Sequence, residues 1–372
     1  MLSGQSFEAD DHFDRLHDSL LCLIFNKIQD AKTLGRCLAV CKRFSSLVRQ
    51  VDSLVVKVDC VDDSVDADDR NSSESHGSSL SIGLAKFLLY RIISKSFRFL
   101  QRTLLFNQKK SISDGSPFHY SPVQVLKRFN EIRALRIQLP DDSGGYGGGG
   151  DGLLLKWRAE FGSSLQSCVF LGATSFQKTK LTCIEKGDRN DCSMSSASVG
   201  GEETSHGSHG SFCTNGKLKL RIVWTITCLI AASARHHLLQ QIIADHPTLR
   251  SVVITDSCGQ GTLCMGEEQI AESRQCLDSS RTSAALPGRT RVPAVNVKLW
   301  YVPRLELPGS GYVMEGATLM AIRPVDRPPE KEESEVSLMA GAFEGEEQGK
   351  TFGEAVRAMA KRKARILEMD SF

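Results

Sequence analysis

Cysteine and histidine side chains are the residues of this chain that could bind a metal. The sequence holds twelve Cys, but no two have the C-x-x-C spacing of a zinc site. His206, His209 and Cys213 lie close together in a Ser- and Gly-rich stretch. Such a stretch favours a flexible polar loop over an ordered metal site. The adjacent His236 and His237 lie on an expected helix and point in different directions, so we expect satisfied or surface histidines and no cofactor.

Glycine and carboxylate clusters could serve phosphate binding or acid–base catalysis. A phosphate-binding loop needs a strand before it and a helix N-terminus after it. The run GGYGGGG at 144–150 follows a strand that ends at Pro140, and its many glycines indicate a linker. Paired carboxylates such as Asp62 and Asp63 lie in loops, where they are solvating charges. The chain has no G-x-S-x-G, so the sequence offers no catalytic constellation.

Charge and hydropathy favour neither a nucleic-acid nor a membrane partner. The formal net charge is +2. The basic cluster Lys361–Lys363 lacks interleaved aromatic residues, and is either a nuclear import signal or, the alternative we favour, the polar face of a C-terminal helix. The apolar run 223–234 is too short to span a bilayer and indicates a buried helix, which we expect over 220–244. With no signal peptide visible, we expect reduced thiols in the nucleus, the cytoplasm or both.

Three short helical segments are expected within residues 12–51. The first carries a wide apolar face with helical spacing, and the two following segments carry smaller ones. A core this small is marginal alone, because surface-to-volume scaling works against it. These helices therefore need the rest of the chain or a partner protein. The apolar residues are Leu16, Leu20, Leu21, Ile24, Phe25 and Ile28, then Leu34, Cys37, Leu38 and Cys41, then Phe44, Leu47, Val48 and Val51.

The order of residues within LHDSLLCLIFNKIQDAKTLGRCLAVCKRFSSL closely resembles the F-box motif. The resemblance implies a helical module that binds a Skp-type adaptor and, through it, a cullin, while the rest of the chain selects a protein substrate. It also implies a non-catalytic subunit of a ubiquitin ligase. The adaptor-binding residues implied in this way are Leu16, His17, Leu20, Leu21, Ile24, Phe25, Leu34, Val40, Cys41, Phe44 and Leu47.

Position 17 departs from the family pattern, which usually has Pro there. Pro at the start of a helix pre-sets φ and loses no useful donor. We expect His17 to give up about 0.5–1 kcal/mol of this organisation and to weaken adaptor binding without abolishing it.

Beyond residue 51, the pattern apolar-x-x-apolar-x-apolar recurs five times and predicts short strands. The first four follow expected helical segments, so the domain is either an ordinary α/β layer or an irregular leucine-rich-repeat-like curve. The fold class predicted is therefore α+β or α/β, with a three-helix N-terminal module. The repeats are Val51/Leu54/Val56, Ile132/Leu135/Ile137, Leu165/Cys168/Phe170, Leu249/Val252/Ile254 and Val292/Val295/Val297.

Composition divides the chain as follows. A disordered N-terminus (1–11) precedes the F-box (12–51), and a substrate-recognition domain (52–325) carries flexible insertions near 59–79, 141–152 and 186–216. A Pro- and Glu-rich linker (326–349) leads to a C-terminal helix (350–372). Phrases such as LWYVPRLELPG and GATLMAIRP also resemble a plant subgroup of F-box proteins, some of which are linked to auxin responses.

Two further functions remain as alternatives. A regulatory, non-degradative interaction role would use the same adaptor-binding module. An enzyme would require a cluster of titratable groups in a pocket, which the sequence does not show.

Overall fold

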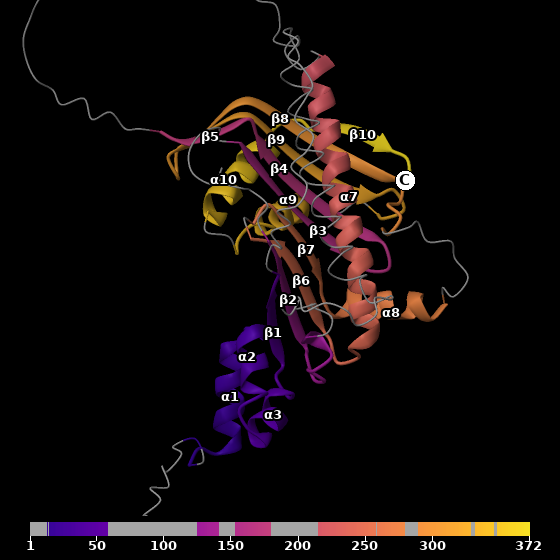
Figure 1. The fold of residues 1–372 in the computed structure, drawn as a ribbon. Coiled ribbons are helices and arrows are strands. Elements are labelled where there is room, and N and C mark those ends of the chain that lie inside the picture. The colour runs from indigo at the N-terminus through magenta and orange to yellow at the C-terminus, as the bar shows by residue number, and fades with distance from the viewer. Residues whose placement is uncertain are drawn as a thin grey trace, which may run out of the picture.

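Three short helices at the N-terminus join a large mixed β-sheet with helices on both faces (Figure 1). This computed structural model describes residues 13, 15–58, 125–140, 153–179, 215–257, 259–279, 289–328, 332–345 and 348–372. The predicted α+β class is confirmed. The expected insertions at 59–79 and 141–152, nearly all of 186–216, and the expected N-terminal disorder at 1–11 lie outside the described residues, as do His206, His209 and Cys213.

The N-terminal helices are α1 (Asp18–Ile28), α2 (Ala31–Cys37) and α3 (Lys42–Val48). Side chains satisfy the free N–H groups where these helices begin. Asp30 Oδ2 accepts a hydrogen bond from Thr33 N–H over 2.9 Å, and Cys41 Sγ accepts one from Phe44 N–H over 3.4 Å. Three helices therefore lie within the range expected for the F-box.

The sheet contains ten strands in the order β1-β2-β6-β7-β3-β4-β9-β8-β10, and β5 pairs with β9. All five strands that the repeated pattern predicts are present, as β1, β2, β4, β6 and β8. The strands are β1 (Ser53–Lys57), β2 (Ala134–Leu139), β3 (Leu154–Phe161), β4 (Leu165–Ala173), β5 (Ser175–Lys178), β6 (Ser251–Asp256), β7 (Gly261–Met265), β8 (Val295–Leu307), β9 (Tyr312–Pro324) and β10 (Arg365–Met369).

Strands β1, β2 and β6 form a parallel ladder in which the repeated pattern stays in register. The first inward positions align as Leu54, Leu135 and Val252, and the second as Val56, Ile137 and Ile254. Three of the five repeats are therefore stacked as in a leucine-rich-repeat curve. The other two are not, because β4 and β8 each lie in a hairpin with a neighbouring strand, and a short turn makes neighbouring strands antiparallel.

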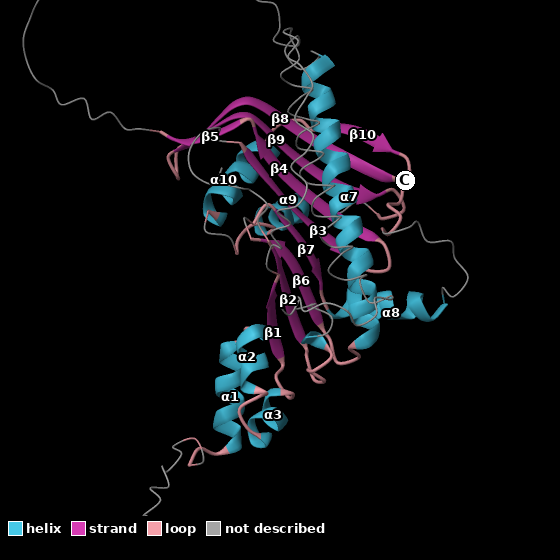
Figure 2. Ribbon diagram, in the orientation of Figure 1, coloured by secondary structure: helices cyan, strands magenta, loops and turns pink. Residues whose placement is uncertain are grey.

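Helix α7 (Asn215–Asp245) packs on β3, β4 and β7, and α8 (Glu267–Ser279) packs beside it (Figure 2). Cys228, Leu229 and Ala232 are fully buried between α7 and the sheet. The helix is long and apolar enough to cross a membrane, but 72% of that apolar stretch is buried inside the protein. The burial is typical of a core helix, which agrees with the prediction from sequence.

The structure corrects the expected linker at 326–349. Helix α9 (Glu332–Gly341) lies within it and buries Met339, Ala340 and the following Phe343 against the sheet. The Glu-rich composition indicated a solvated segment, but Glu335 is buried. Its charge is neutralised by Lys298, whose Nζ donates to the Glu335 carboxylate over 2.6 Å.

The expected C-terminal helix over 350–372 is also wrong in its second half. Helix α10 (Gly349–Ala360) ends before the basic cluster, and Arg365–Met369 forms β10, antiparallel to β8. Pairing with a distant strand overrides the local helical pattern. The cluster Lys361–Lys363 is exposed in the turn between them, so it is not the polar face of a helix.

Candidate functional site

The chain before α1 is held against α3. The guanidinium of Arg43 donates to Asp18 Oδ1 through Nε over 2.8 Å and to the carbonyl oxygens of Phe13 and Leu16. The ring of Phe13 packs edge-on against Phe44, with 5.7 Å between ring centroids. These contacts fix the segment that leads into α1, and with it the position of Leu16.

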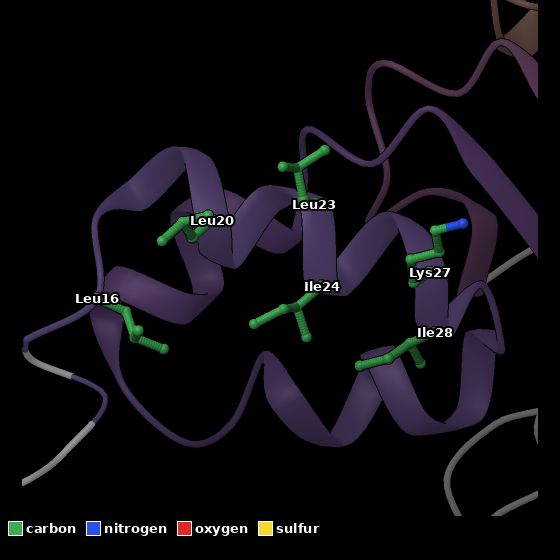
Figure 3. A pocket seen from close by; sticks show the side chains of 6 residues that line it. All are labelled: Leu16, Leu20, Leu23, Ile24, Lys27 and Ile28. Carbon is green, nitrogen blue, oxygen red and sulfur yellow. The ribbon is translucent and has the colours of Figure 1, made fainter.

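The outward face of α1 is apolar. Leu20, Leu23 and Ile24 have exposed fractions of 49%, 63% and 43%. They line a shallow hollow of about 470 Å³, and their side chains lie along one side of the helix (Figure 3). Exposed apolar residues gathered in one patch mark a site of protein interaction. The full lining is Leu16, Leu20, Leu23, Ile24, Lys27 and Ile28.

The predicted adaptor-binding residues divide into three groups. Leu21, Phe25, Leu34 and Leu47 are buried in the core, so they support the surface and do not form it. Leu16, Leu20 and Ile24 line the hollow. The others lie elsewhere around the module: His17, Val40 and Cys41 are exposed and Phe44 is half-buried.

Leu23, Lys27 and Ile28 line the hollow but are absent from the predicted set. Helical spacing is the signal that could have found them, because residues at i, i+3, i+4 and i+7 share a face. Leu23 and Lys27 follow Leu20 at the third and seventh positions. The family pattern drew attention to other positions instead.

His17 is the N-cap of α1 and not a residue of its first turn. Its Nδ1 accepts from Ser19 N–H over 3.3 Å and shares a hydrogen bond of 2.8 Å with Ser19 Oγ. His17 therefore makes capping contacts that proline could not make, and these offset the loss expected from the absence of proline.

The thiols of Cys22 and Cys37 are poor nucleophiles. Burial, followed by the charge of Asp18, raises the pKa of the Cys22 thiol, and burial raises that of Cys37. A thiol with a raised pKa stays protonated at neutral pH and neither attacks substrates nor binds metals readily. Within the described residues, no three His, Cys, Asp or Glu side chains are grouped so that they could hold a metal. The chemistry of this surface is apolar contact.

The module is continuous with the sheet. The C-cap of α1, Gln29, has a left-handed φ of 55°, and its carbonyl oxygen accepts from Val55 N–H over 2.8 Å. Asp30 forms a parallel bridge with Val55, and Asn26 Oδ1 accepts from Asp52 N–H over 2.9 Å. The loop between α1 and α2 therefore extends the edge of β1 and fixes the helices to the sheet.

The known proteins that this chain resembles are named F-box proteins. The F-box protein At4g18380 of Arabidopsis thaliana is 44% identical, in an alignment that covers 97% of this chain and 94% of that protein. The F-box protein At5g46170 of the same plant is 45% identical with the same coverage. The F-box protein AUF1 is 32% identical over 97% of this chain and 100% of its own length. No protein-family model and no solved structure matches the chain.

Proposed function

Since the chain belongs to the F-box protein family, we propose that it is the substrate-recruiting subunit of an SCF-type cullin–RING ubiquitin ligase. F-box proteins in general are substrate-recognition subunits that bind Skp-type adaptors. The observation that carries the proposal for this chain is the exposed apolar face of α1, at Leu20, Leu23 and Ile24. No segment that the structure describes covers this face, and an adaptor would bury it.

The mechanism proposed is proximity. The chain holds a substrate near a ubiquitin-loaded enzyme and raises the effective concentration of the two reactants without performing bond chemistry itself. The adaptor would bind α1 and the segment before it, and the cullin would bind through the adaptor. The protein would act in the nucleus, the cytoplasm or both.

The test is adaptor binding by the double variant Leu20→Ala/Ile24→Ala. Both side chains are half exposed, so we expect only a small loss of stability but at least a tenfold loss of affinity for a purified Skp-type adaptor. Isothermal titration calorimetry measures the affinity, and thermal unfolding monitors the fold. The matched control is Val325→Ala/Leu338→Ala, which removes similarly exposed apolar side chains elsewhere on the surface. Equal binding by wild type and the α1 variant would contradict the proposal.

A reconstituted ligase separates the two roles that the sequence left open. Transfer of ubiquitin to a captured protein supports the degradative role. Adaptor binding without assembly onto a cullin supports the regulatory role instead.

A further inference from the structure

One face of the sheet carries the side chains that alternate with the core residues of β1, β2, β6, β7 and β3. Along a strand, successive side chains point to opposite faces. The inward residues of these strands pack with α7 and the N-terminal helices in one core. The outward residues are half-buried or exposed: Val55, Lys57, Arg136, Gln138, Val253, Thr255, Thr262, Cys264, Lys156, Arg158 and Glu160.

No described helix covers the central part of this outward face. Helices α7 and α8 lie on the opposite side of the strands (Figure 2). Helices α9 and α10 lie on the outward side but over β8 and β9. They reach only its border at β3, where Arg158 donates to the Ala342 carbonyl over 3.4 Å and Lys156 Nζ lies 5.6 Å from the centre of the Phe352 ring. The N-terminal helices border the face at its other end, beside β1.

Positive charge is in excess on this face. The carboxylate of Glu160 lies 4.0 Å from Arg158 and also accepts from Ser167 Oγ, so it is already engaged. Lys57 and Arg136 lie on adjacent parallel strands, diagonal to each other, because Lys57 is opposite Gln138 and Arg136 is opposite Val55. Both side chains are exposed. The outward strand residues thus comprise Lys57, Arg136, Lys156 and Arg158 against Glu160, and the neighbouring Asp30 carboxylate also interacts with the charge of Lys57.

The charged residues lie on the strands to either side of β6 and β7: Lys57 and Arg136 on β1 and β2, and Lys156, Arg158 and Glu160 on β3. Burial is the main cause that raises the pKa of the Cys264 thiol, and the charges of Arg158, Glu160 and Arg136 also act on it. Cys264 is opposite Val253 on one side and Glu160 on the other. The valines and threonines between the cations offer apolar contact and hydroxyl donors to an extended chain.

We propose that this outward face binds an acidic, extended segment of the protein that the chain recruits. The proposal rests on the proposed function and adds a class of ligand to it. Carboxylates would contact Lys57 and Arg136, and apolar side chains would contact Val55 and Val253. A single-stranded nucleic acid fits less well, because such ligands stack on aromatic side chains and the outward residues of these strands include none.

The experiment selects ligands from a random twelve-residue peptide display library on the full chain in complex with its adaptor. We expect enrichment of peptides that combine several Asp or Glu with apolar residues. Fluorescence anisotropy then measures the affinity of the enriched peptides. Lys57→Glu/Arg136→Glu is expected to weaken binding at least tenfold, and raising the salt concentration should weaken it further, since charges at the surface are screened.

The control is Lys361→Glu/Lys363→Glu, which makes the same change of charge at another exposed place. Equal losses in the two variants would show that overall charge, and not this face, is responsible, and would overturn the proposal. Enrichment of neutral or basic peptides, or no enrichment at all, would overturn it too. So would an RNA oligonucleotide that binds this face while acidic peptides do not. If the reversal variant does not fold, Lys57→Gln/Arg136→Gln takes its place. Adaptor binding is measured in parallel, so a failure of the proposed function is seen separately.

Discussion

His17 starts α1 with a side-chain cap, where the family pattern usually has a proline. Its φ of −68° lies within the range that proline adopts, and its side chain caps Ser19 N–H. We expect His17→Ala to destabilise the protein by about 0.5–2 kcal/mol through loss of the cap. His17→Pro should recover about 0.4–1 kcal/mol of this by stiffening the unfolded chain. Urea unfolding measures both, and a proline variant less stable than the alanine variant would show that our account of this position is wrong.

A second residue, His236, gives the fold a pH dependence. It is fully buried on α7, where Nε2 lies 3.0 Å from the Gly162 carbonyl oxygen and Nδ1 lies 2.8 Å from Thr290 Oγ1. Burial lowers its pKa to about 4. Between the unfolded pKa near 6.5 and this value, the unfolded chain binds the proton and the folded chain does not. Stability therefore falls as the pH drops through this window, by up to about 1.4 kcal/mol per unit.

Denaturant titrations from pH 7 to pH 4 measure this slope. His236→Gln should flatten it. His237→Gln is the comparison. Burial also lowers the pKa of this half-buried ring, but by less, so this variant should flatten the slope less than His236→Gln does. A slope that is unchanged in His236→Gln would assign the pH dependence to other groups.

The sequence predicts the apolar residues of α1 but does not show which of them face the core, because core and surface residues are only one position apart. Leu20 and Ile24 are spaced as Leu21 and Phe25 are, so both pairs fit one wide apolar face of a helix. Leu21 and Phe25 are buried in the core of the module, while Leu20 and Ile24 are exposed. This difference depends on how α1 packs, which the local sequence pattern does not show. The sequence could therefore identify the module, while the division between core and surface required the tertiary structure.

At the scale of elements, the strands were easier to predict than the chain ends. Period-two alternation identified β1, β2, β4, β6 and β8 because the positions that the pattern marks in each strand are buried. Helix α9 was missed because its Pro- and Glu-rich surroundings indicated a solvated linker. Strand β10 was missed because its partner, β8, is far away in the sequence.

Helix α9 provides a direct test of this correction. Phe343, which follows α9, is 1% exposed, while Leu338 within the helix is 56% exposed. Phe343→Ala should lower the free energy of unfolding by about 3–5 kcal/mol, because it leaves a cavity under α9. Leu338→Ala should change it by less than about 0.5 kcal/mol. Thermal and chemical unfolding compare the two, and a neutral Phe343→Ala would restore the linker interpretation.

At the scale of the whole molecule, the N-terminal helices and the sheet share one core, which includes Phe25, Leu54 and Leu135. We expect them to unfold together. All three tryptophans, Trp157, Trp224 and Trp300, lie on the sheet or on α7, so their fluorescence reports that part alone. Binding of a purified Skp-type adaptor would report whether the N-terminal helices are folded. The two signals should be lost at the same urea concentration, and Leu54→Ala should shift both. Two separate transitions would show that the helices fold independently.

The bridge between Asp30 and Val55 also sets an orientation. Because the F-box adjoins β1 directly, the strands from β1 to β2, β6 and β7 lie at increasing distances from the helices that we propose bind the adaptor. Neighbouring strands are about 4.8 Å apart and are rotated relative to each other by about 20–25°. If the chain recruits a substrate as we propose, a substrate bound one strand further along would be presented to the ligase at a different distance and angle. The substrate lysines within reach of ubiquitin would then depend on which strands hold the substrate.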